Sequence, residues 1–204
     1  MRLFWSSRSP FVRKVMVVAH EVGVADTLEL ESVAVGAAIL SEAVMAHNPL
    51  NKIPALILND GSTLFDSRVI AEFFDGYERE PSLFPIGRDD RISALRWQAI
   101  GDGIMENATL TLGERKRQGA SFSQRHEASY RLKTRLALDL LEKEAVALTN
   151  SALNIGSVAI GVALSHLDFR FAEENWRHDR LGLADWYAKF AERKSMQSTA
   201  FVDG

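Results

Sequence analysis

The sequence contains no cysteine. Disulfide bonds, thiolate metal sites and a cysteine nucleophile are therefore excluded, together with reactions that pass through a mixed disulfide with a protein thiol. The absence by itself leaves the compartment open. Because nothing in the sequence contradicts the cytosol, we expect a cytoplasmic protein.

An excess of positive charge is also missing. The net charge is −3, with 7 Lys and Arg against 11 Asp and Glu in residues 1–80, and 17 against 16 in residues 81–204. Neither part is basic enough to gather phosphates, so we expect no nucleic-acid partner. The five histidines show no spacing typical of a metal site, and we expect no bound metal.

Long apolar runs are missing as well. The longest apolar tract, residues 155–164, is interrupted by two glycines and a serine, whereas a membrane span needs roughly 18 uninterrupted apolar residues. The N-terminus enters an apolar stretch directly, without the apolar core and small-residue cleavage site of a signal peptide. We therefore expect a soluble protein with no membrane partner.

What the sequence does have is the composition of a globular protein, with 47% hydrophobic and 25% charged residues in a chain of 204. Over its first part, strand and helix signals alternate. Residues 2–5 predict a buried strand, and Ser9 and Pro10 predict the start of a helix that ends at Gly23. The later patterns predict a strand at 28–31, a weak helix at 35–47, a hairpin of 55–58 and 63–65, and a helix that begins at 66–67.

Residues 80–87 hold two of the five prolines and predict a linker. Beyond it the sequence predicts helices alone, at about 89–115, 123–148, 154–171 and 183–195. The helix after Asn154 is apolar nearly all round, which is typical of the buried centre of a helical bundle. We therefore expect an α/β domain at residues 1–79, a linker at 80–88 and an all-helical domain at 89–204.

Three motifs stand out in the first domain: LFWSSRSPFVRKV at residues 3–15, NPLNKIPAL at 48–56 and FDSRVIAEF at 65–73. Together with residues 159–170 and 184–190 they resemble the serine-type glutathione transferases, and the resemblance covers nearly the whole chain. It implies a thioredoxin-like N-terminal domain, an all-helical C-terminal domain, a homodimer, and glutathione as co-substrate.

The second and third motifs imply the residues that bind glutathione. A cis bond between Ile53 and Pro54 would turn the Ile53 N–H and C=O outward, where the cysteinyl segment of glutathione can pair as a short added strand; without the family, Pro54 equally suits the rigid entry of a strand. Lys52 would face the glycyl carboxylate, or is a solvated surface lysine. Asp66 and Ser67 would hold the γ-glutamyl ammonium and carboxylate at a helix N-terminus, which they would cap in any case.

Ser9 is the candidate thiol activator. Its position before Pro10 makes it a helix cap whatever else it does. A hydroxyl donor at a helix N-terminus would also favour the glutathione thiolate, because a free thiol with a pKa near 8.5 is only a few per cent ionised at neutral pH. Ser6 and Ser7 are alternative donors.

The implied activity is conjugation of glutathione to a small hydrophobic electrophile, as in detoxification, with isomerisation or reductive dehalogenation left open. By position and family analogy, the second-substrate pocket would be lined by Phe11, Ile104, Asn107, Ala108 and Thr111. The alternative is a non-catalytic adaptor or regulator, since a fold does not imply a function. Two departures from the family pattern favour it: Asp66 stands where many relatives have Glu, and residues 36–40 lack a cation that some relatives have there.

Arg13 is harder to interpret. It falls in the first turn of the predicted helix, where the helix dipole disfavours a cation. We therefore expect an acidic partner for it, such as Glu106 or glutathione itself.

Overall fold

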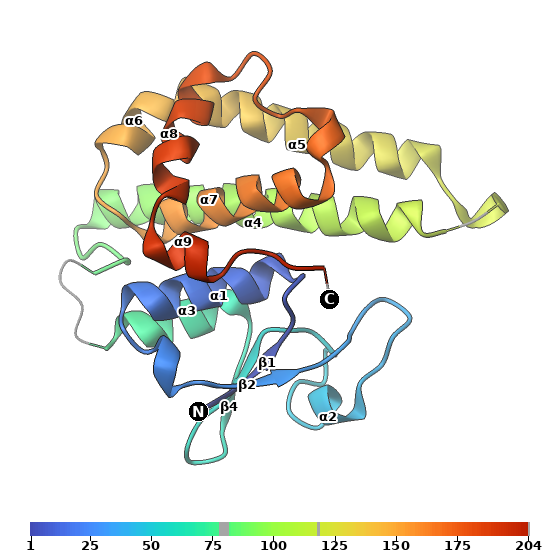
Figure 1. The fold of residues 1–204 in the computed structure, drawn as a ribbon, viewed down its shortest axis with the longest axis vertical. Coiled ribbons are helices and arrows are strands. Elements are labelled where there is room, and N and C mark those ends of the chain that lie inside the picture. Colours follow the sequence, from blue (N-terminus) through green and yellow to red (C-terminus); the bar gives the residue numbers. More distant parts are fainter. Residues whose placement is uncertain (78–81, 118, 204) are drawn as a thin grey trace. The chain divides into compact units, whose positions relative to one another are not determined.

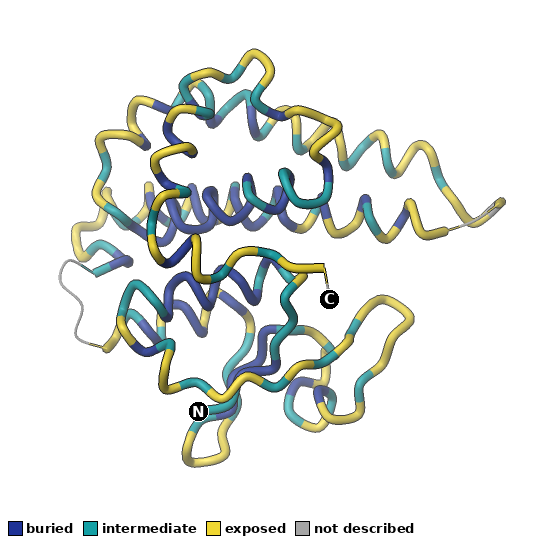
Figure 2. Tube along the Cα trace, viewed as in Figure 1, coloured by how far each residue is buried: buried dark blue, intermediate teal, exposed yellow. Residues whose placement is uncertain are grey.

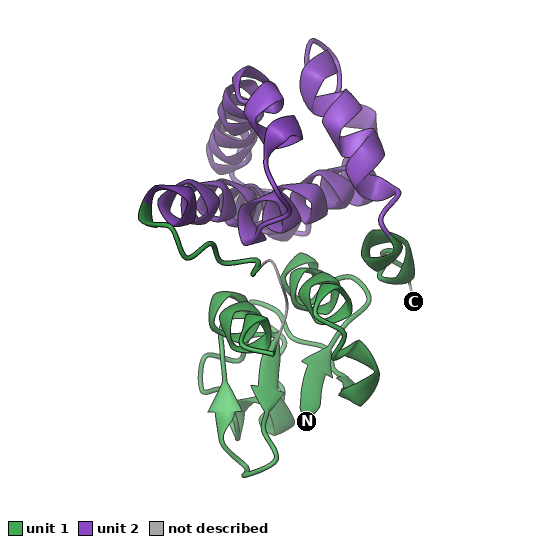
Figure 3. Cartoon of the chain, turned by 90° about the vertical axis from the view of Figure 1, so that its left-hand side faces the viewer, with its two compact units in different colours: residues 1–88, 194–204 green, residues 89–193 purple. Residues whose placement is uncertain are grey.

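The computed structural model in Figure 1 describes residues 1–77, 82–117 and 119–203. The chain divides into two compact units (Figure 3): the first contains Met1–Arg88 and Lys194–Gly204, and the second contains Asp89–Arg193. Glu80 and Pro81, at the start of the predicted linker, lie outside the described residues. Within the described ranges, no helix is both long and apolar enough to cross a membrane.

The first unit is built on a four-stranded mixed sheet. Its strands are β1 (Arg2–Trp5), β2 (Glu29–Ser32), β3 (Ala55–Ile57) and β4 (Thr63–Leu64), in the order β2-β1-β3-β4. β1 runs parallel to β2 and antiparallel to β3, and β4 runs antiparallel to β3. The mixed sheet agrees with the α/β domain that the alternating patterns predicted.

Helices complete the first unit. They are α1 (Pro10–Glu21), α2 (Glu42–Met45), α3 (Ser67–Asp75) and α9 (Lys194–Ser198), with a 3-10 turn, η1, at Ala25–Thr27. α1 packs side by side with α3 and with α9 (Figure 1). α2 contributes Val44 to a buried cluster with Phe4 and Ala55 of the sheet. Because side chains alternate along a strand, the fully buried Leu3 and Leu56 point to the opposite face.

The helix predicted at residues 35–47 is mostly absent. Only Glu42–Met45 is helical, and Ser41 caps it by accepting a hydrogen bond from the Val44 N–H at 3.3 Å. Upstream, residues 36–40 are all exposed, and Gly36 and Ile39 form an isolated bridge instead. A stretch that buries no apolar side chain gains no packing energy, so the propensity of its alanines is insufficient to form a helix.

The second unit is helical throughout its described part. Its elements are α4 (Arg88–Arg115), α5 (Gln124–Lys143), α6 (Ala145–Asn150), α7 (Ile155–Arg170) and α8 (Leu181–Ala191), with 3-10 turns η2 (Gly119–Ser121) and η3 (Ala172–Glu174). α7 is buried nearly all round (Figure 2), as predicted for the helix after Asn154. A Cβ on Gly101 of α4 would overlap the backbone of Ala159, so these two helices approach closely.

Two helices predicted in the C-terminal part have different boundaries in the structure. The helix predicted at 123–148 is interrupted at Glu144, which separates α5 from α6. The Glu144 carboxylate accepts hydrogen bonds from Arg96 and from the Trp97 indole, both on α4. The helix predicted at 183–195 ends at Ala191, and residues 194–204 belong to the first unit, not to a domain of residues 89–204. The contacts of this last segment with α1, described below, account for the difference.

Candidate functional site

The register of the sheet brings the three predicted motifs to one end of it. Phe4 pairs with Ala55 in the antiparallel β1–β3 ladder, so the loop after β1 meets the segment that enters β3. Leu56 pairs with Leu64 in the β3–β4 ladder, so the segment that leaves β4 meets the same end. Neighbouring strands lie about 4.8 Å apart, so the three segments span roughly 10 Å.

Ser9 lies at this end as the cap of α1. Its Oγ accepts a hydrogen bond from the Val12 N–H at 3.3 Å, and its own N–H donates to the Ser6 carbonyl at 3.2 Å. The Ser9 hydroxyl proton has no acceptor among the described residues. The Ser7 hydroxyl, in contrast, donates to the Val202 carbonyl at 2.9 Å. Of these two serines, Ser9 is therefore the one free to donate to a ligand.

Ile53 enters the sheet through a cis peptide bond with Pro54, as the family resemblance implied. Its side chain packs against the buried cluster of Phe4, Val44 and Ala55, which fixes the position of its backbone. In the part of the chain that the structure describes, neither the N–H nor the C=O of Ile53 has a hydrogen-bond partner. One donor and one acceptor of the main chain are thus available to an extended ligand.

Two asparagines that the sequence analysis missed hold the loop before Ile53. The buried Asn48 donates from its side chain to the Lys52 carbonyl at 2.9 Å and accepts from the Leu50 N–H at 3.1 Å. Asn51 adopts a φ of 51°, and its amide bonds the backbone of Ser41 and Ile39. Asparagine tolerates this left-handed conformation better than most residues, and that preference is the signal in the sequence that could have identified Asn51.

Asp66 and Ser67 form the start of α3, as predicted. Asp66 is exposed, and its carboxylate caps the helix by accepting from the Arg68 N–H at 2.9 Å. Ser67 is only 3% exposed, yet its hydroxyl has no hydrogen-bond partner within the described residues. Because this unpaired hydroxyl belongs to an otherwise buried residue, Ser67 is a candidate ligand contact beside the positive end of the helix dipole.

Lys52 is exposed, and no described acid lies within ion-pair distance of its ammonium. Its backbone is fixed through Asn48, so the base of the side chain has a defined position. The ammonium is therefore available to an anionic ligand that lies along Ile53.

The comparisons with known proteins decide the family. Residues 8–76 match the family model for the glutathione S-transferase N-terminal domain. Over 202 residues, 98% of this chain and 98% of the relative, the sequence is 30% identical to the uncharacterized GST-like protein YibF of Escherichia coli K12. The chain belongs to the glutathione S-transferase family.

Two crystal structures of a glutathione transferase family member from Pseudomonas fluorescens Pf-5 are similar to the whole chain. The one with bound glutathione is 35% identical, with a TM-score of 0.95 and coverage of 99% of both chains. The one with bound S-(propanoic acid)-glutathione is 36% identical, with a TM-score of 0.88 and coverage of 100% of both chains. The likeness confirms the predicted fold, a thioredoxin-like N-terminal part and a helical C-terminal part.

The residues predicted to line a second-substrate pocket come from both units. Phe11, half-buried on α1, belongs to the first unit. Ile104, Ala108 and Thr111 are buried on one face of α4 in the second unit, and the Thr111 hydroxyl donates to the carbonyl of the half-buried Asn107 at 2.8 Å. Their assembly into one pocket stays a prediction.

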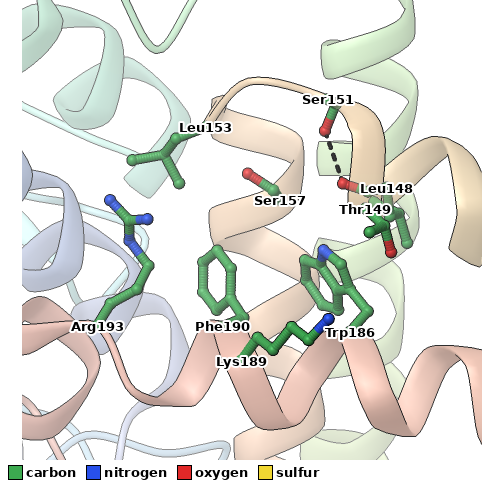
Figure 4. Close-up of a pocket in the computed structure, with 9 residues that line it drawn as sticks. All are labelled: Leu148, Thr149, Ser151, Leu153, Ser157, Trp186, Lys189, Phe190 and Arg193. Carbon is green, nitrogen blue, oxygen red and sulfur yellow. Dashed lines mark hydrogen bonds between the residues drawn. The ribbon is translucent and has the colours of Figure 1, made fainter.

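The helical unit has a partly open pocket of its own (Figure 4). Its lining residues are Leu148, Thr149, Ser151, Leu153, Ser157, Trp186, Lys189, Phe190 and Arg193. The rings of Trp186 and Phe190 stack at 4.9 Å, and the Ser151 hydroxyl donates to the Leu148 carbonyl at 3.0 Å. The hydroxyls of Thr149 and Ser157 likewise bond carbonyls of their own chain segment. These polar groups are satisfied by the fold, and none of them is a predicted site residue.

Across residues 1–77, 82–117 and 119–203, no group of three His, Asp or Glu side chains lies close enough together to hold a metal ion.

Proposed function

We propose that this chain binds glutathione at the end of the sheet formed by β1, β3 and β4, and conjugates its thiol to a small apolar electrophile. The observation that carries the proposal is Ser67 at the start of α3, a residue that is only 3% exposed and whose hydroxyl has no partner within the described residues. A carboxylate placed there accepts hydrogen bonds from the hydroxyl and from the free N–H groups of the helix.

The dimensions of the ligand support this position. An extended tripeptide spans about 10 Å, which matches the roughly 10 Å across three adjacent strands. Its cysteinyl backbone pairs with the unused N–H and C=O of Ile53. The γ-glutamyl carboxylate then lies at Ser67 with its ammonium near Asp66, and the glycyl carboxylate faces Lys52. The glutathione bound in the relatives from Pseudomonas fluorescens adds family support.

The chemistry needs only a donor for the thiolate. Ser9 donates its unused O–H to the glutathione sulfur, and the start of α1 adds its dipole. Lowering the thiol pKa by ~2 units corresponds to ~2.7 kcal/mol. The thiol proton goes to solvent, and the thiolate forms the carbon–sulfur bond. In a substitution the leaving group departs with the electron pair of the broken bond; in an addition the resulting carbanion takes up a proton from solvent. Phe11, Ile104, Asn107, Ala108 and Thr111 are the proposed walls for the electrophile.

Calorimetric titration with glutathione tests the binding. We expect millimolar affinity or better, and Ser67→Ala should weaken it by ~1–3 kcal/mol, the cost of a lost hydrogen bond to a charged group. Ser93→Ala is the matched control, because the Ser93 hydroxyl is exposed and donates to a carbonyl of its own helix. Absence of any heat from glutathione would overturn the proposal and favour the adaptor.

Turnover is tested separately with glutathione and a panel of electrophiles and peroxides. Conjugation of at least one apolar electrophile is the expected result. Glutathione binding without turnover of any compound would retain the site and favour a non-catalytic adaptor.

We further propose that the protein is a homodimer, as the family resemblance implies. Residues 1–80 carry a net charge of −4 and residues 81–204 a net charge of +1. The first part of one copy is therefore weakly attracted to the second part of another copy. Sedimentation at micromolar concentration should show twice the chain mass of 22.7 kDa. A species with the mass of one chain would contradict the proposal.

A further inference from the structure

The C-terminal segment of the chain lies along α1 in the first unit (Figure 1). Near the end of α1, the hydroxyl of the buried Ser195 donates to the Glu21 carboxylate at 2.6 Å. At the start of α1, the Arg13 guanidinium donates to the Met196 carbonyl, and before α1 the Ser7 hydroxyl donates to the Val202 carbonyl. The segment therefore runs antiparallel to α1 and ends beside the loop that carries Ser9.

Ser7 and Val202 make a reciprocal contact at this loop. The Ser7 hydroxyl donates to the Val202 carbonyl at 2.9 Å, and the Val202 N–H donates to the Ser7 carbonyl at 3.5 Å. Ser9 follows two residues later, and its N–H donates to the Ser6 carbonyl on the other side of Ser7. The C-terminal segment thus fixes the middle of the turn that positions Ser9.

Arg13 makes the second contact, one turn into α1. It is 6% exposed, and its guanidinium donates to the Met196 carbonyl at 2.9 Å and to the Thr199 hydroxyl at 3.4 Å. The same group lies 4.4 Å from the centroid of the Phe201 ring. A planar guanidinium can donate in its own plane while its face lies on an aromatic ring. These partners explain how a cation is accommodated where the α1 dipole disfavours it.

We propose that residues 199–203 form a C-terminal clasp, in which Ser7, Arg13 and Phe201 are positioning residues that hold the Ser9 hydroxyl toward the glutathione sulfur. The inference rests on the proposed role of Ser9. Without the clasp, the turn before α1 samples several conformations, so the Ser9 O–H meets the sulfur for only part of the time. The contacts proposed for the glutathione peptide, at Lys52 and Ser67, belong to other segments and remain.

The test compares two variants that break the same contact from opposite sides. A chain that ends at Ala200 lacks Phe201 and Val202, and Ser7→Ala lacks the donor. In each we expect kcat to fall about three- to tenfold and the pKa of the bound glutathione thiol, followed by its ultraviolet thiolate absorbance, to rise by about half a unit to one unit. The KM for glutathione should stay within about twofold of the original. Because the shortened chain already lacks the Ser7–Val202 contact that Ser7→Ala removes, combining the two changes should lower kcat no further than the shortening alone.

Two controls accompany these variants. Gln197→Ala changes an exposed side chain on α9 that takes no part in the clasp, and it should leave kcat and the thiol pKa unchanged. Ser7→Thr keeps the hydroxyl and should restore both values. Should the shortened chain fail to fold, Ser7→Ala and Phe201→Ala carry the same test in the full-length protein.

The outcomes separate this inference from the proposed function. If Ser7 were itself the thiol donor, ending the chain at Ala200 would free its hydroxyl and kcat would hold or rise, which would overturn the clasp. If Ser9→Ala raises the thiol pKa but the clasp variants do not, the clasp is wrong and the role of Ser9 stands. If Ser9→Ala leaves the thiol pKa unchanged, the proposed role of Ser9 fails, and the clasp fails with it.

Discussion

Replacing Ser9 with alanine separates the two roles of its side chain. As a cap, the Ser9 Oγ accepts from the Val12 N–H at 3.3 Å, and losing a cap of this kind costs about 1 kcal/mol of stability. Folded domains are stable by about 5–15 kcal/mol, so the variant should still fold. Circular dichroism and denaturant unfolding measure this first effect directly.

The effect on the thiol is larger. A hydrogen bond to a charged acceptor contributes about 1.5–3 kcal/mol, which corresponds to ~1–2 units in the pKa of the bound thiol. Near neutral pH the rate should therefore fall by ~10–100-fold. Glutathione binding should change little, because its peptide backbone and both carboxylates are bound at Ile53, Lys52 and Ser67 in the proposed complex.

The decisive assay is the dependence of kcat/KM on pH for the folded variant. If Ser9 stabilises the thiolate, the lost rate returns as pH rises above the ordinary thiol pKa of about 8.5, where the thiolate forms unaided. Ser6→Ala tests the alternative donor, because the Ser6 Oγ accepts a 3.4 Å hydrogen bond from the Arg8 N–H and its own O–H has no acceptor among the described residues. A uniform loss at every pH would refute this reasoning for Ser9, and an unchanged profile would reduce the residue to a cap.

Two further predictions concern the helical unit. Glu144 accepts two hydrogen bonds from the Arg96 guanidinium, which hold the pKa of its carboxyl below the ordinary 4.5. The ion pair therefore stabilises the fold above that pH. This stabilisation is lost as pH falls through the lowered pKa. Since Arg96 is half-exposed, Glu144→Gln should cost only about 1 kcal/mol near neutral pH, and urea unfolding should show this difference disappearing in acid. A Cβ on Gly161 would overlap the Phe190 ring, so Gly161→Ala should lower the free energy of unfolding by ~1–3 kcal/mol. At the matched control Gly103 nothing described lies within 4 Å of the new Cβ, and Gly103→Ala should be neutral or stabilising by up to ~1 kcal/mol.

The sequence predicted the elements that local patterns control. Ser9 and Pro10 specify the start of α1 through the cap and the fixed proline φ, and the structure has the helix from Pro10. The apolar run after Asn154 predicted the central helix, and Asn154 with Ser157 forms its capping box. Both signals act within a few residues, so they can be interpreted without knowing the rest of the fold.

Features that depend on distant contacts were not predictable in the same way. The segment of residues 194–203 packs against α1 because Arg13 and Glu21, more than 170 residues earlier in the chain, bond to Met196 and Ser195. Neither partner is marked by a local pattern. Asn48 was missed for a related reason: its side chain serves the backbone of Lys52, and that contact exists only once the loop has formed.

The candidate site is best understood as a set of polar groups that the fold positions but does not use. Folded proteins pair the great majority of their buried polar groups, because an unpaired one costs free energy. At one end of this sheet, the Ile53 backbone, the Ser67 hydroxyl and the Ser9 O–H all lack partners within the described residues. Ser67 is a buried residue, whereas Ser9 and Ile53 are half-buried, and their free groups can bond water when no ligand is bound. A ligand with a peptide edge, a carboxylate and a thiolate would pair all of these groups together, and this is the physical reason to expect glutathione at that place.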